Sequence, residues 1–255
     1  MTASAESPLL QAGAARGPTA TMPSTRVTER LVFGLLASAA RLVPIPFLDD
    51  VLRDTAARLM VRRILRSRGR TYPTSRVEPL YTDRSGCLTG CFVFGFKLML
   101  FPLRKIVTWV LAAKYLARDL SEAILLGRVL DRMLDAGRLQ GPDEAALLAE
   151  SDRIKTAWEN AVRGTDMKLL QGIVWRALRS VEGLPRAAMH ALRRLRGGGE
   201  DADPTEGLSA SDRAKVDEGA AKIEGALADP QVQAFLEAFD ARFDENLRVL
   251  EARVG

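Results

Sequence analysis

The sequence is poor in the residues that build metal centres. Among its 255 residues it has one histidine, His190, and two cysteines, Cys87 and Cys91. A single histidine excludes histidine-rich metal sites and the two-histidine motif of zinc proteases. These three residues also cannot supply the four ligands of a structural zinc site without a carboxylate. We therefore expect no bound metal and no cofactor. We interpret the cysteines as packing residues, with a redox pair or lipidation near a membrane as the alternatives.

Catalytic motifs are also missing. No G-x-S-x-G pattern occurs, and a serine–histidine–aspartate triad would have to use His190, which lies in an arginine-rich helical stretch. Residues 90–97 contain a G-x4-G pattern, but the lysine is displaced by one position and no hydroxyl follows it, so we reject a phosphate-binding loop. Asp119, Glu122 and Asp131 could meet in a pocket, but we interpret them as a solvated face. The sequence thus predicts a protein that is not an enzyme.

Strand-forming residues are scarce as well. Aromatic residues make up 6% of the chain, and Val/Ile/Thr-rich runs as long as a strand are few. Ala, Leu, Arg and Glu dominate, and this mixture favours helices. We expect an all-α protein, an irregular helical bundle with one long helix at about 103–136 and a C-terminal helical hairpin.

Breaks in the helical pattern divide the chain into segments. Residues 1–24 are rich in Ala, Ser, Thr, Pro and Gly and are typical of a disordered leader. We expect a helical body at 25–196, a flexible linker at 197–207 (GGGEDADPTEG) and an acidic helical hairpin at 208–255. Residues 22–39 also look like a signal peptide, but their apolar core is short, so we expect an ordinary first helix there.

Charge is distributed unevenly along the chain. The first 118 residues hold 18 Lys and Arg against 7 Asp and Glu, a net charge of +11, whereas the remainder has a net charge of −6. Such a basic front favours an anionic partner: phospholipid, nucleic acid or the chain's own acidic tail.

The basic front contains a hydrophobic segment, residues 86–118, in which every charged residue is positive. Its first part, 86–103, is eighteen mostly apolar residues with one lysine, slightly short of a membrane span. A helix in the headgroup layer, a re-entrant hairpin and a core helix of a soluble bundle are the alternatives. Our candidate residues for binding lipid or another anion are Arg58, Arg62, Arg66, Lys97, Arg104 and Lys105.

The last predicted helix, within 231–254, has the clearest amphipathic pattern in the sequence. Its apolar stripe includes Phe239, Phe243 and Leu247, and it has to dock on the body of the protein, on a second copy or on a partner. We predict that these three residues contact a protein partner or mediate self-association. We also expect the acidic hairpin either to bind that partner or to cover the basic face when lipid is absent.

Residues 41–69 read RLVPIPFLDDVLRDTAARLMVRRILRSRG, in which a P-I-P turn, two acids and an arginine-rich helix ending at Gly69 follow one another. This stretch resembles uncharacterised membrane-associated helical bacterial families such as EcsC-like proteins, and also the small helical domain attached to some GTPases. No G-domain motif accompanies it here. The resemblance implies a helical protein near a membrane, and it supplies no catalytic residues.

We therefore expect a non-enzymatic bacterial protein at the cytoplasmic face of the inner membrane, peripheral or re-entrant, that binds anionic lipid through its front half. The alternative is a soluble helical adaptor or nucleic-acid-binding protein with a basic face. Nucleic acid is the less favoured partner, because no recognisable reading module is present and the aromatic residues of the basic region lie in apolar runs.

Overall fold

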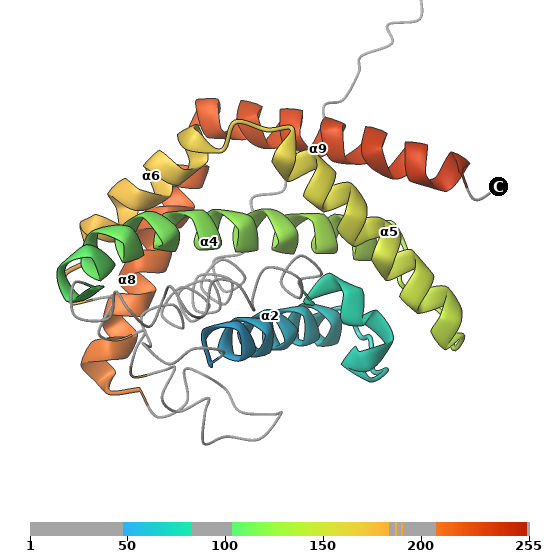
Figure 1. Ribbon diagram of the computed structural model, residues 1–255, viewed down its shortest axis with the longest axis horizontal. Coiled ribbons are helices and arrows are strands. Elements are labelled where there is room, and N and C mark those ends of the chain that lie inside the picture. The colour runs from blue at the N-terminus through green and yellow to red at the C-terminus, as the bar shows by residue number, and fades with distance from the viewer. Residues whose placement is uncertain (1–47, 83–103, 184–186, 188–189, 191–207, 254–255) are drawn as a thin grey trace, which may run out of the picture.

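The structure is a computed structural model that describes residues 48–82, 104–183, 187, 190 and 208–253 (Figure 1). The described residues form helices and no strand, so the prediction of an all-α fold is confirmed. In chain order the elements are α2 (Leu48–Ser67), the 3-10 helix η1 (Thr74–Leu80), α4 (Arg104–Asp135), α5 (Glu144–Arg163), α6 (Lys168–Arg179), α8 (Ala210–Leu227) and α9 (Pro230–Ala252). The leader at 1–24, the first helix expected at 22–39 and the linker at 197–207 lie outside these ranges.

Helix α4 is the long helix predicted at about 103–136, and it runs through the middle of the described structure (Figure 1). Its 32 residues span about 48 Å at 1.5 Å per residue. From Ala117 to Leu134 it buries apolar side chains on more than one face, including those of the consecutive residues Ile124, Leu125 and Leu126. A helix that is apolar over so much of its circumference has to be covered from several sides.

Helix α2 lies along α4 and runs in the same direction, as the colour gradients in Figure 1 show. Arg68, just beyond the end of α2, forms ion pairs with Asp131, at 3.3 Å, and with Asp135, both in the last two turns of α4. The C-terminal ends of the two helices therefore lie together. Gly69 ends α2 in the left-handed conformation, with φ +72°, as its place after the last turn predicts.

The connection from α4 to α5 is tight and buries a leucine. Gly137 has φ +77° and closes α4, after which Leu139 also has a positive φ of 54°, a conformation that costs a residue with a side chain about 1–2 kcal/mol. The Leu139 side chain is fully buried, its N–H donates to Glu150 at 3.0 Å, and its carbonyl accepts from the Tyr72 hydroxyl at 3.1 Å. These contacts offset the backbone cost and fix where α5 begins.

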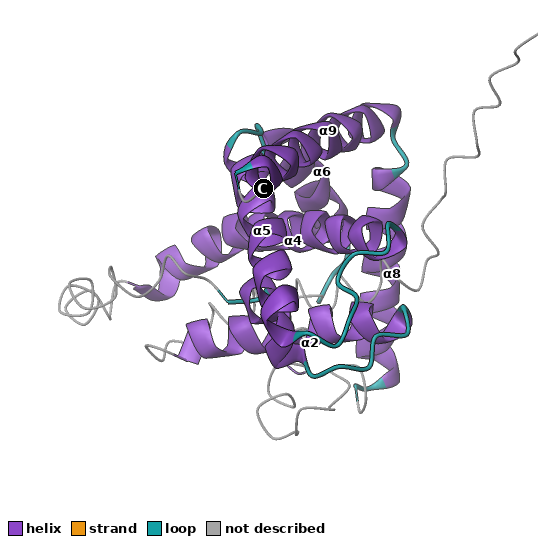
Figure 2. Ribbon diagram, turned by 90° about the vertical axis from the view of Figure 1, so that its right-hand side faces the viewer, coloured by secondary structure: helices purple, strands orange, loops and turns teal. Residues whose placement is uncertain are grey.

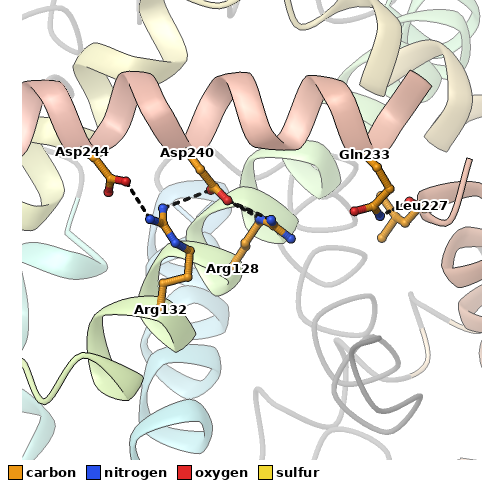
Figure 3. Close-up of polar contacts among 6 residues, drawn as sticks. All are labelled: Arg128, Arg132, Leu227, Gln233, Asp240 and Asp244. Atoms are coloured by element: carbon orange, nitrogen blue, oxygen red, sulfur yellow. Dashed lines mark hydrogen bonds and ion pairs between the residues drawn. The ribbon is translucent and has the colours of Figure 1, made fainter. Parts of the chain in front are cut away.

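The two last helices are well capped and lie at a steep angle to each other (Figures 1 and 2). Asp229 caps α9 by accepting from the Gln231 N–H at 2.8 Å, and Gln233 donates across the turn to the carbonyl of Leu227 (Figure 3). The helices follow one another as in the predicted hairpin. However, α8 packs mainly on α6 and α9 packs mainly on α5, so each is part of the body.

The apolar stripe of α9 faces the interior of the chain. Phe239 and Phe243 are fully buried, and Leu247 is 6% exposed. The prediction that these three residues contact a partner is therefore corrected, because their side chains are already buried in the protein's own hydrophobic core. The apolar pattern left three docking surfaces open, namely the body of the protein, a second copy and a partner. In the structure, α9 docks on the body of the protein.

We expect Phe243→Ala to lower the free energy of unfolding by about 3–5 kcal/mol, because it removes a fully buried ring and leaves a cavity. Urea denaturation followed by circular dichroism measures this value. Val249→Ala, on the same helix but 42% exposed, is the matched control and should change stability by less than about 0.5 kcal/mol. Equal small effects for the two variants would mean that the stripe is not docked on the body.

Candidate functional site

Three of the predicted anion-binding residues lie on one side of α2, and we call Arg58, Arg62 and Arg66 the arginine ladder. They span about 12 Å along the helix. Arg58 and Arg62 are half-buried and Arg66 is exposed, in the last turn, where a cation suits the helix dipole. The Arg58 Nε donates to the Thr74 hydroxyl at 3.5 Å, so the N-terminal end of the ladder is turned towards η1.

The other predicted cations do not join the ladder. Arg104 and Lys105 occupy the first turn of α4, and Lys97 lies outside the described residues. Arg104 stands 27 residues before Asp131, about 40 Å, whereas Arg58 stands only 10 residues before Arg68, about 15 Å. Because Arg68 pairs with Asp131 and the helices run parallel, about 25 Å of helix axis separates Arg104 from Arg58.

The acidic residues of α4 do not form the predicted solvated face. Asp119 and Asp131 are buried, each with 7% exposure, and only Glu122, which pairs with Arg118 at 2.8 Å, is turned towards solvent. The prediction is wrong for the two aspartates because the fold buries both side chains, and Asp131 also pairs with Arg68 beyond the end of α2. Asp119 and Asp131 are also about 18 Å apart along the helix, too far to act on one substrate group.

The most extensive polar cluster joins α4 to α9 (Figure 3). Arg128 contacts Asp240 through both Nε, at 3.0 Å, and Nη2, at 2.8 Å. Arg132 reaches Asp240 at 3.2 Å and Asp244 at 2.7 Å. The two arginines are four residues apart, and so are the two aspartates. The arginines therefore lie on one face of α4, and the aspartates that pair with them lie on one face of α9. The Asp240 side chain is only 13% exposed, which places its charge in a partly desolvated setting.

The acidic residues of α9 therefore pair with arginines other than those of the predicted arginine ladder. Besides Arg128 and Arg132, it reaches Arg138, which pairs with Glu251 at 2.7 Å. Helix α2 lies on the other side of α4 from α9 in both views of the molecule (Figures 1 and 2). In this structure α9 does not cover helix α2, which carries the arginine ladder, and Lys97 of the predicted basic face lies outside the described residues.

The single histidine makes a contact that the sequence pattern does not indicate. His190 Nδ1 lies 3.0 Å from Oδ2 of Asp212 in the first turn of α8, and since a carboxylate only accepts, Nδ1 carries the proton. The hydrogen bond from His190, and after it that from Ser209, lowers the pKa of the Asp212 carboxyl, against the raising effect of burial. The Ser209 hydroxyl accepts from the Asp212 N–H at 3.1 Å, as a helix cap does.

This histidine cluster differs from a catalytic triad. In a triad the serine hydroxyl bonds to the histidine, which takes its proton. Here Ser209 bonds to Asp212 and to Ser211, and the described residues include no bond between Ser209 and His190. We therefore assign the cluster to holding the start of α8 against the segment that precedes the linker.

Two further properties of the described part bear on function. None of its helices has the length and apolar character needed to cross a membrane. No group of three or more His, Cys, Asp or Glu side chains within it could hold a metal ion, while Cys87 and Cys91 lie outside it.

In comparisons with known proteins, no family model matches the chain, and neither a curated protein nor a solved structure matches it.

We expect Asp240→Asn to destabilise the protein by about 1–3 kcal/mol, because it leaves the partly buried Arg128 without its carboxylate and removes one of the two carboxylates that Arg132 contacts. Chemical denaturation measures the loss. Glu245→Gln is the control on the same helix: its pair with Arg248 is exposed and should contribute between 0 and about 1 kcal/mol. A loss for Asp240→Asn no larger than the control's would contradict a structural role for the cluster.

The lowered pKa of Asp212 predicts a pH dependence. Its folded-state pKa lies below the ordinary value of 3.8, so its ionised form stabilises the fold above that value. This stabilisation is lost as the pH falls through the folded-state pKa. Thermal unfolding of the wild type and of Asp212→Asn between pH 6 and pH 2.5 should show a difference in Tm at pH 6 that shrinks below about pH 4. A difference that stays constant over this range would rule out the carboxylate as its source.

Proposed function

We propose that this is a non-enzymatic protein that associates with the cytoplasmic face of the inner membrane and binds anionic lipid through its basic front half. The observation that carries the proposal is the separation of charge across α4. Helix α2, which carries the arginine ladder, lies on one side of α4, and the acidic helix α9 lies on the other (Figure 1). An anionic surface can approach the α2 side without meeting the carboxylates of α9.

The binding free energy expected from these charges suits reversible association with a membrane. Each Lys or Arg near an anionic leaflet contributes about 1 kcal/mol. Arg62 and Arg66 of the ladder would therefore supply about 2 kcal/mol, and Arg104 and Lys105 at the start of α4 would add to this. The apolar sequence of 86–103 immediately precedes that start and supports contact with the headgroup layer.

A protein partner of the C-terminal segment would have to use the outer surface of α9. Its apolar stripe is buried, but Glu237 and Glu245 are exposed and negatively charged. Such a partner would be basic, and it would bind on the side of α4 that faces away from the ladder.

Flotation of the purified protein with vesicles tests this function. We expect binding to vesicles of phosphatidylcholine with 30% phosphatidylserine, little binding to pure phosphatidylcholine, and weakening between 50 and 300 mM salt. The double variant Arg62→Gln/Arg66→Gln should bind about 30-fold more weakly, at about 1 kcal/mol per residue. Arg248→Gln/Arg253→Gln, near the end of α9, removes the same charge elsewhere and should bind like the wild type.

Failure to bind either kind of vesicle would overturn the proposed function and favour a soluble adaptor. Binding of the wild type with no loss in the Arg62→Gln/Arg66→Gln variant would show that the ladder is not the lipid contact.

A further inference from the structure

The outer face of α6 carries cations that the fold leaves unused. The inner face of this helix is apolar and buried, through Leu170, Val174 and Leu178, and packs on α4 and α8. The opposite face is exposed, and its members are Lys168, Leu169, Gly172, Arg176 and Arg179. We call these five residues the α6 outer face.

Arg176 and Arg179 differ from the arginines of the core helices. In the described part of the chain, these two exposed guanidinium groups make no hydrogen bond and no ion pair, whereas Arg128, Arg132 and Arg138 are all paired with carboxylates. The nearest acids in the sequence stand at the two ends of the helix. Asp166 is at 3.9 Å from Lys168, and Glu182 follows the last turn. The middle of the face is therefore positive.

Apolar surface accompanies these charges. Leu169 is 38% exposed and is one of only two large apolar side chains exposed in the described residues. Trp175 stands at the edge of the face and is partly buried against the core. At Gly172 an added Cβ would meet no atom within 4 Å, so nothing projects from the centre of the face. Arginine with leucine and tryptophan on one helix is typical of contact with the headgroup layer of a membrane.

The position of α6 agrees with that contact. It packs on α4 and lies at the end of the molecule where α4 begins, whereas the C-terminus of α9 lies at the opposite end (Figure 1). The sequence also remains basic after the helix: residues 176–196 hold six arginines and one glutamate. The charges of Arg176 and Arg179 on α6 attract anions over a distance of about a Debye length, roughly 8 Å at physiological salt.

We infer that the α6 outer face is a second membrane contact that docks on an anionic lipid surface. This inference rests on the proposed function and adds a surface to it. A membrane fits better than nucleic acid, because a leucine stands among the cations and no aromatic side chain on this face is fully exposed to stack on bases.

Vesicle partitioning of Arg176→Gln/Arg179→Gln tests the inference. We expect the partition coefficient on vesicles containing 30% phosphatidylserine to fall about 30-fold, which is about fivefold for each arginine near an anionic leaflet. Arg248→Gln/Arg253→Gln, at the opposite end of the molecule, removes the same two charges and should leave partitioning within about twofold of the wild type. Circular dichroism and Tm of both variants confirm that they are folded.

A second measurement locates the contact. In a Cys87→Ala/Cys91→Ala background, Leu169→Cys and Val249→Cys are each labelled with an environment-sensitive dye. The dye at position 169 should shift to shorter wavelength when vesicles are added, and the dye at position 249 should not, because that residue is on α9.

The outcomes separate the two proposals. If the wild type does not bind the vesicles, the proposed function is overturned. If the wild type binds but Arg176→Gln/Arg179→Gln binds equally well, or the dye at position 169 does not respond, the α6 outer face is not a membrane contact. If these arginines instead affect binding to a short DNA duplex and leave partitioning unchanged, the face is a nucleic-acid surface and the inference is overturned.

Discussion

Helix α4 imposes the main constraint on this fold, because it is apolar over more than one face from Ala117 onward. A helix of this kind is stable in water only when other helices cover most of its circumference. Helix α2 packs along it, and α5 and α6 contact it from other directions. Helix α9 adds the ion pairs of Arg128 and Arg132. The surfaces that remain for a partner are therefore the outer sides of the covering helices.

Helix α9 is held by two kinds of interaction on adjacent sides of its axis. Its phenylalanine stripe, with Phe239 and Phe243, is buried where it meets α5, while Asp240 and Asp244 pair with α4. The apolar contact supplies most of the stabilisation, since truncation of a buried ring costs roughly 3–5 kcal/mol. The ion pairs fix the register, because a shift of one residue would separate both aspartates from their arginines.

Local features of this fold could be predicted from the sequence, but long-range contacts could not. The periodic apolar residues of α4 and the glycine at position 69 act within a few residues of chain, so pattern and capping rules apply to them. The pairing of Arg128 with Asp240 joins residues 112 apart, and several other acids on exposed faces could have served equally well. The burial of Asp119 does not follow from the sequence for the same reason, because a side chain on a helix is buried only by other elements that pack against it.

The 112 residues between Arg128 and Asp240 also set the order of events on the ribosome. At roughly 5–20 residues per second, α9 is synthesised on the order of 10 s after α4. Until then, the arginines of α4 have no carboxylates to pair with, and the apolar surface that receives Phe239 stays uncovered. Exposed apolar surface of this kind is prone to aggregation and is a substrate for chaperones. The helix that completes the fold is thus also the one whose late arrival makes the nascent chain most vulnerable.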